Sequence, residues 1–338
     1  MTDIVSDDRS RAVADIYNST VAAWAISAAW EVGLLDELDL CGELKVEQFA
    51  EDHDLDLRST IGLLRSLAAV HVVERGENTV RVGANFEEVL RNRAFFHWLC
   101  RGSAALFTQI PHVMRNENRT GEFFERDAAA IAFACREINI HCYDPAFLAA
   151  LDRVDFDVTT VADLGCGSGG RVIQLSRRYP KARTLGIDIA RPSLAVAASD
   201  VEAAGLADRV TLIEADVLDL PNRPDFAEVE LLTCFMMGHD FWPKERCVPL
   251  LRGLREAFPN VRRFVLGDAT RTVGVPDDRL PVFTLGFEFG HDLMGVYLPT
   301  VEEWESAFAE SGWRVVERNL IDIAVGEVVF ELEPVGER

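Results

Sequence analysis

The spacing of apolar positions changes near residue 157 and divides the chain into two parts. Before this point, apolar residues recur at steps of three and four, as amphipathic helices require. They include Val13, Ile16, Val21, Trp24, Ala25 and Ala28. From Thr159 onward, short apolar runs alternate with helical patterns, which is typical of a parallel sheet covered on both faces. We expect strands near 159–164, 183–188, 209–214, 229–235 and 261–267, helices near 170–178, 192–204, 244–257 and 301–311, and closing extended runs over 313–318 and 325–332.

Residues 44–83 predict a compact unit of their own. The expected elements are helices over 46–52 and 59–69, then extended runs 71–74 and 79–82 around a hairpin turn at 76–78. This order is typical of a winged helix, which serves either DNA binding or a dimerisation or scaffolding role. Acidic residues around the first helix would repel phosphate and so favour dimerisation. They are Glu43, Glu47, Glu51, Asp52, Asp54 and Asp56.

Residues 86–150 are again helical in pattern but rich in aromatic side chains. We therefore expect a helical and winged-helix dimerisation domain over 1–85, a helical linker and lid over 86–156, and a larger domain over 157–338. The expected fold class is α/β, with a Rossmann-like, mostly parallel sheet preceded by the helical domain.

The charge balance disfavours several kinds of partner. The 338 residues include 34 Lys and Arg against 56 Asp and Glu, a formal net charge of −22. Nucleic acids and anionic membranes are bound through basic clusters, so we expect neither as a partner. No apolar run approaches the roughly 18 to 20 residues of a membrane span, and the N-terminus lacks the pattern of a targeting peptide. Seven scattered cysteines without a CxxC pair indicate reduced thiols and a cytoplasmic location.

A glycine-rich loop follows the first expected strand of the α/β part. The strand contains Asp163 near its end, and glycine then stands at Gly165, Gly167 and Gly169 before a helix begins. Glycine there allows a tight turn and a close approach of the backbone to a ligand. A dinucleotide loop has the spacing Gly-x-Gly-x-x-Gly and holds a pyrophosphate. Asp163 would repel a pyrophosphate and suits a cationic or amine-bearing ligand.

Carboxylates also stand at the ends of the next two expected strands. Asp188 comes 23 residues after Gly165, where a strand-end carboxylate can accept hydrogen bonds from both hydroxyls of a ribose. Asp216 follows the third strand, at a position suited to an exocyclic amine.

Over residues 157–335, these features together resemble the class I S-adenosylmethionine-dependent methyltransferases. The resemblance implies the seven-stranded sheet of that class and S-adenosylmethionine as cofactor. It implies that the cofactor loop is formed by Asp163, Gly165, Gly167 and Gly169. It also implies that Asp188 binds the ribose and that Asp216 binds the adenine. The front half is similar to the winged-helix domain of small-molecule O-methyltransferases, which implies a homodimer and a helical cover over the substrate.

Two histidines are candidates for the chemistry at the methyl acceptor. His239 follows the fourth expected strand, and in winged-helix O-methyltransferases a similar His-Asp-Trp segment supplies the general base. His291 follows the fifth strand, in a segment that we expect to be a loop at the same edge of the sheet. With Asp240 they make a 2-His-1-carboxylate set, which suits non-haem Fe(II). Met236 either adds a thioether ligand or packs in the core. Such a metal could chelate a 2-oxo acid and favour proton loss from the adjacent carbon.

Residues 235–243 and 289–292 more closely resemble the 2-oxo acid β-carbon methyltransferases of non-ribosomal peptide pathways, in particular the phenylpyruvate type. That family uses non-haem iron. The resemblance implies that His239 and His291 bind the metal, with Asp240 and Met236 as further candidates around it.

The same resemblance implies that Arg126 binds the substrate carboxylate and that Trp98 lines the pocket. The residues alone leave Arg119 as an equally good anion binder. The spacing assures no base for the β-proton, which goes either to Asp240 or to a metal-bound water.

Three functions remain open at this point. The first is metal-dependent C-methylation of a 2-oxo acid, either phenylpyruvate or a branched aliphatic acid. The second is O-methylation with His239 as general base, which needs neither a metal nor His291. The third is a winged-helix regulator whose methyltransferase-like half senses a ligand.

Overall fold

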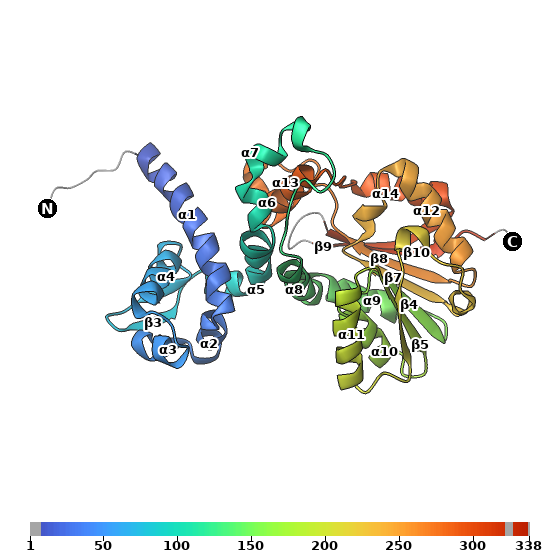
Figure 1. Ribbon diagram of the computed structural model, residues 1–338, viewed down its shortest axis with the longest axis horizontal. Helices are drawn as coiled ribbons and strands as arrows, with labels where there is room; N and C mark the ends of the chain where they lie inside the picture. The colour runs from blue at the N-terminus through green and yellow to red at the C-terminus, as the bar shows by residue number, and fades with distance from the viewer. Residues whose placement is uncertain (1–7, 322–326, 337–338) are drawn as a thin grey trace. The chain divides into compact units, whose positions relative to one another are not determined.

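The computed structural model describes residues 8–321 and 327–336, and these fall into two compact units (Figure 1). Within the described part, the first unit comprises residues 8–109 and 122–134. The second comprises residues 110–121, 135–321 and 327–336.

The first unit contains a winged helix, as the sequence predicts. Its α3 (Val46–Asp52) and α4 (Leu57–Ala69) precede a hairpin of β2 (Val73–Arg75) and β3 (Thr79–Val82). A short strand that the pattern did not predict, β1 (Glu43–Lys45), pairs antiparallel with β3 and completes a three-stranded sheet. Asp56 begins α4 by accepting a hydrogen bond from the backbone N–H of Ser59 at 2.7 Å.

Further helices complete the first unit. They are α1 (Asp8–Glu31), α2 (Leu34–Cys41), α5 (Phe86–His97), the π-helix η1 (Trp98–Gly102) and α6 (Ala104–Thr108). Helix α1 packs on α4 and α5. Its opposite face exposes a row of apolar side chains at helical spacing, made of Val13, Ile16, Tyr17, Val21 and Trp24, which we call the α1 stripe.

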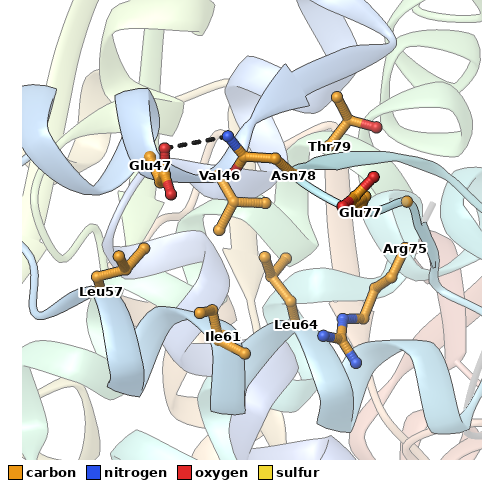
Figure 2. Close-up of a pocket in the computed structure, with 10 residues that line it drawn as sticks. Val46, Glu47, Leu57, Ile61, Leu64, Arg75, Glu77, Asn78 and Thr79 are labelled. Atoms are coloured by element: carbon orange, nitrogen blue, oxygen red, sulfur yellow. Dashed lines mark hydrogen bonds between the residues drawn. The ribbon is translucent and has the colours of Figure 1, made fainter.

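The winged helix also contains a pocket of about 390 Å³ between α4 and the hairpin (Figure 2). Leu57, Ile61 and Leu64 of α4 form its apolar side. Glu47 and Asn78 lie on the facing side and are joined by a hydrogen bond of 3.1 Å. No group of three His, Cys, Asp or Glu side chains arranged to hold a metal ion occurs here or elsewhere in the described residues.

A seven-stranded sheet forms the centre of the second unit, in the order β6-β5-β4-β7-β8-β10-β9. Strands β4 to β8 are mutually parallel, and β10 pairs antiparallel with β8 and β9. The strands are β4 (Thr160–Leu164), β5 (Arg183–Asp188), β6 (Val210–Glu214), β7 (Leu231–Phe235), β8 (Arg263–Asp268), β9 (Trp313–Ile321) and β10 (Glu327–Pro334). The expected strands are thus confirmed as elements within the described residues, which do not include positions 325 and 326 of the last one, and the fold class is α/β as predicted.

Helices cover both faces of this sheet (Figure 1). On one face lie α9 (Asp144–Asp152), α10 (Gly170–Arg178) and α11 (Arg191–Ala203), and on the other lie α12 (Lys244–Ala257) and α14 (Val301–Ser311). The second face has a core of large aromatic side chains, in which Trp304, Phe308 and Phe330 are fully buried. Apolar burial of this kind contributes roughly 25 cal/mol per Å² and makes the sheet a rigid platform for its loops.

Two features differ from the sequence-based expectations. Residues 86–156 do not form a segment of their own. Helix α5 packs on α1 in the first unit, whereas α9 packs on β8 and β10 in the second. The segment around His291, expected to be a loop, is helix α13 (Thr284–Met294).

No helix among the described residues is long and apolar enough to cross a lipid bilayer.

Candidate active site

The parallel strands of the second unit all end at one edge of the sheet, and the segments that leave this edge contain the predicted site residues from Asp163 to His291. The chain runs from β4 outward through β5 to β6, then returns to the other side of β4 with β7 and β8. This reversal is a topological switch point, where open α/β sheets bind their ligands.

The glycine loop leaves β4 at the switch point. Gly165, Gly167 and Gly169 have φ angles of +68°, +52° and +82°, which residues with a side chain rarely adopt. A Cβ atom at Gly165 would lie 2.5 Å from Sδ of Met237, whereas one at Gly167 would meet nothing within 4 Å. The backbone at Gly167 therefore borders open space, as a ligand-binding loop requires.

Asp188 at the end of β5 is tied to this loop. Its Oδ2 accepts a hydrogen bond from the backbone N–H of Gly167 at 2.8 Å, and its Oδ1 accepts one from Ala190 at 2.7 Å. A carboxylate has about four lone-pair positions. These two contacts therefore orient the side chain and leave it acceptor capacity for two ribose hydroxyls.

Asp163 and Asp216 differ from each other in environment. Asp163 is 3% exposed, and its Oδ1 accepts a hydrogen bond from the Thr233 hydroxyl of β7 at 2.5 Å. Burial raises the pKa of Asp163 to about 6. Asp216 is exposed and accepts a hydrogen bond from the backbone N–H of Leu218 at 2.9 Å.

His239 is held by a carboxylate that the sequence reasoning missed. It lies in the short 3-10 helix η6 (Gly238–Phe241) after β7, and its Nδ1 donates to Oδ1 of Asp268 at 2.7 Å. Asp268 ends β8 and is fully buried, and its Oδ1 also accepts from the backbone N–H of Ala269 at 2.9 Å. Its Oδ2 has no hydrogen-bond partner among the described residues.

His291 meets His239 across the edge of the sheet. The two ring centroids are 5.1 Å apart, with the ring planes at 90°. Nδ1 of His291 donates to the carbonyl of Phe287 at 2.8 Å, and the Phe287 ring packs on the imidazole at 4.0 Å. Because Nδ1 carries the proton in each hydrogen bond, Nε2 carries the lone pair of each neutral ring.

The other two candidates for the metal site do not complete a ligand set. The side chain of Asp240 is exposed, and the carboxylate in contact with His239 is that of Asp268. Met236 is half-buried at the end of β7 and has a φ of +56°. The expected group of two histidines and one carboxylate is therefore not assembled within the part of the chain that the structure describes.

The remaining predicted residues belong to the first unit. Trp98 is 2% exposed and begins the π-helix η1, whereas Arg126 is half-buried in the segment before α8 (Ala128–Ile138). Arg119, the alternative anion binder, belongs to the second unit and donates to backbone carbonyls there.

A sheet of this order, a glycine loop after its first parallel strand and a carboxylate ending the second define a class I S-adenosylmethionine-dependent methyltransferase. A model of the methyltransferase domain matches residues 161–259. Methyltransferase ungE' of Aspergillus campestris is 50% identical over 336 residues, which cover 97% of this chain and 98% of that protein. The chain belongs to the S-adenosylmethionine-dependent methyltransferases.

More distant relatives agree with this assignment. Indolepyruvate C-methyltransferase of Streptomyces griseus is 26% identical over 332 residues, which cover 95% of this chain and 94% of the relative. Human N-acetylserotonin methyltransferase in complex with S-adenosylmethionine has a TM-score of 0.70 at 17% identity, covering 98% of this chain and 99% of its own. Mitomycin 7-O-methyltransferase MmcR has a TM-score of 0.65 at 20% identity, covering 97% and 98%. At such identities the solved structures show a shared fold.

Proposed function

We propose that this methyltransferase transfers the methyl group to the β-carbon of a 2-oxo acid, with phenylpyruvate as the first candidate and branched aliphatic 2-oxo acids as the second. The observation that carries the proposal is the proximity of His239 and His291, whose ring centroids are 5.1 Å apart and whose Nδ1 atoms each donate a hydrogen bond. The name of the Streptomyces griseus relative, indolepyruvate C-methyltransferase, describes carbon methylation of an aromatic 2-oxo acid and supports the same chemistry.

The two imidazoles fit a divalent transition metal, for which we propose non-haem iron. Metal-binding histidines usually donate their other ring N–H to a carboxylate or a backbone carbonyl. Asp268 and Phe287 supply these two acceptors. Two protein ligands would leave positions for the carboxylate and keto oxygens of the substrate. A metal bound there would act as a Lewis acid that polarises the keto group and acidifies the β-carbon.

The chain's own residues then have three tasks. The glycine loop and Asp188 hold the methyl donor at the switch point. His239 and His291 orient the acceptor, and a base removes the β-proton. The new C–C bond forms as the methyl C–S bond breaks, and the electron pair of that bond leaves with sulfur as S-adenosylhomocysteine. In-line alignment of these atoms supplies much of the rate enhancement.

For the substrate carboxylate we propose Arg126 as the partner, with Trp98 at the substrate side chain. A guanidinium can bind a carboxylate through two parallel hydrogen bonds, which Lys cannot reproduce. Arg126→Lys should therefore raise KM for the 2-oxo acid at least about tenfold, since such bonds contribute ~1.5–3 kcal/mol, and should leave the Kd of S-adenosylmethionine unchanged. An unchanged KM would show that Arg126 does not bind the substrate carboxylate.

O-methylation remains a second candidate because of the His239–Asp268 pair. A histidine with a buried carboxylate on Nδ1 has the arrangement of a general base, which could deprotonate a hydroxyl acceptor without a metal. Under this alternative, His291 would have no chemical task.

Turnover with defined acceptors separates the two candidates. The full chain is incubated anaerobically with S-adenosylmethionine, phenylpyruvate and Fe(II), and the product is analysed by mass spectrometry and proton NMR. We expect a methyl doublet coupled to the β-hydrogen, with turnover abolished by a chelator and by His291→Ala. A methoxy singlet, or turnover indifferent to both treatments, would contradict C-methylation. His141→Ala, on an exposed histidine of the π-helix η3 (Asn139–Tyr143), is the matched control.

A further inference from the structure

One arginine joins the ends of two helices beside the histidine pair. Nη1 of Arg119 donates to the carbonyl of Val113 at 3.0 Å and to that of Leu293 at 2.8 Å. Its Nη2 donates to the carbonyl of Asp292 at 3.3 Å. Val113 ends α7 (Ile110–Val113), and Asp292 and Leu293 lie in the last turn of α13, directly after His291.

This contact completes the C-terminus of α13. The last carbonyls of a helix have no partner within the helix and must find one elsewhere. The carbonyl of His291 accepts from the backbone N–H of Val296 at 2.9 Å, and that of Asp292 accepts from Gly295 at 3.1 Å. For the carbonyl of Leu293, the partner is Arg119. A cation at this end also interacts favourably with the helix dipole.

A second arginine, Arg271, contacts acidic side chains on one face of α13. Nη2 of Arg271 contacts Oδ1 of Asp292 at 2.5 Å, and its Nη1 lies 3.5 Å from Oε2 of Glu288. The backbone N–H of Thr272 donates to Oε1 of Glu288 at 2.7 Å. Glu288 and Asp292 are four residues apart on one face of α13, so the helix is held over a full turn next to His291.

Both histidines are thus oriented from one stretch of chain. Asp268 holds His239, and Arg271, three residues later, holds the helix of His291. A shift of α13 along or around its axis would change the separation of the two rings. Displacements of about 1 Å in such sites can cost 100-fold in activity.

We propose that Arg119 and Arg271 are positioning residues that set the separation of the two imidazoles for metal binding. The inference rests on the proposed metal site of His239 and His291. The planar guanidinium suits the role because its Nη1 donates to one carbonyl of each helix while its Nη2 donates to a second carbonyl of α13. The ammonium of Lys, on a flexible stem, does not hold this fixed geometry. Arg119 therefore acts on the helix of His291, and carboxylate binding is left to Arg126.

The test is metal binding by the full chain, measured apart from turnover. Co(II) is titrated anaerobically into the wild type and into Arg119→Met, Arg119→Lys and Arg271→Met, and the visible d–d absorption gives Kd. We expect Kd to rise roughly 10- to 100-fold in Arg119→Met and Arg271→Met. Arg119→Lys should lie between these variants and the wild type. The control is Arg115→Met, because Arg115 donates to the carbonyl of Pro111 in its own segment.

Three results bear on the inference. A Kd within twofold of wild type in both Met variants would overturn it. Weakened binding together with a loss of thermal stability beyond that of the control would identify a structural role only, so thermal unfolding and the Kd of S-adenosylmethionine are measured in parallel. Absence of saturable Co(II) binding in the wild type, or binding that His291→Ala leaves intact, would overturn the metal site itself and the positioning role with it.

Discussion

Asp268 and His239 are 29 residues apart in sequence, yet Oδ1 of the carboxylate lies 2.7 Å from Nδ1 of the imidazole. The contact joins η6, which follows β7, to the end of β8, the neighbour of β7 in the sheet. Asp268→Asn should preserve the shape of this contact and remove the charge that fixes the tautomer. We expect kcat to fall roughly 10- to 100-fold, measured by product formation. Asp208→Asn, at an exposed position, is the control, and Asp240→Asn tests the other carboxylate near His239. If Asp240→Asn were the more damaging variant, the carboxylate next to His239 would have been assigned wrongly.

The glycine loop allows stability and cofactor binding to be separated. Gly165→Ala adds a methyl group that would lie 2.5 Å from Sδ of Met237, and it also imposes a left-handed backbone on alanine. Gly167→Ala has the same backbone cost, roughly 1–2 kcal/mol, but meets no atom within 4 Å. We expect Gly165→Ala to have a lower melting temperature than Gly167→Ala. We expect Gly167→Ala to bind S-adenosylmethionine more weakly than wild type even at temperatures where the variant is fully folded. Calorimetry of unfolding and of cofactor binding measures both effects.

The buried Glu327 should make stability depend on pH. It begins β10, is fully buried, and neither side-chain oxygen has a hydrogen-bond partner among the described residues. Burial, and to a lesser extent the charge of Asp268, raises the pKa of Glu327 from 4.5 to about 8. The folded state then holds a proton that the unfolded state releases, so stability falls as pH rises between these two values, at about 1.4 kcal/mol per pH unit.

Glu327→Gln removes this dependence because the amide is neutral at every pH. We expect the melting temperature of the variant, relative to wild type, to increase steadily from pH 5 to pH 8 and to level off above. Glu77→Gln, at an exposed position in the hairpin of the first unit, should show no such trend. A constant difference between Glu327→Gln and wild type would mean that the two states bind this proton equally.

We propose that the chain forms the homodimer that its sequence resemblance implies, and that the α1 stripe mediates this self-association. Ile16 and Tyr17 are 70% and 72% exposed, although apolar side chains at this helical spacing normally face a partner. We expect the wild type to elute as a dimer in size-exclusion chromatography with light scattering, and Ile16→Glu to elute as a monomer. Asn18→Glu introduces the same charge about half a turn away and should leave the dimer intact. A dimer in Ile16→Glu would place the interface elsewhere.

Much of the second unit could be predicted from its sequence because alternating strands and helices leave a strong periodic pattern. Helix α13 could not, since Gly286 and Gly290 interrupt an apolar run that is too short to show a helical period. The helix forms through contacts distant in sequence, with Arg119 at its end and Arg271 along its side. Local propensity contains no information about either contact.

In the candidate site, too, the sequence predicts residues at strand ends but not the contacts between them. Asp163 and Asp188 are recognisable because each stands at a fixed place relative to the glycine loop. Asp268 stands in the same way at the end of the fifth parallel strand, after Leu266 and Gly267, so its place at this edge of the sheet is also predictable from the sequence. That its carboxylate, and not that of Asp240, contacts His239 depends on the pairing of β7 with β8.

The path of the chain between the two units has a consequence for engineering. The chain leaves the first unit after Gln109, returns at Glu122 and leaves again after Ala134. A hybrid enzyme that borrows the first unit of a relative, for example to change acceptor preference, therefore needs three splice junctions. A truncation beginning at residue 157 would discard Arg119 together with α9, and it should yield an insoluble fragment in place of a minimal transferase.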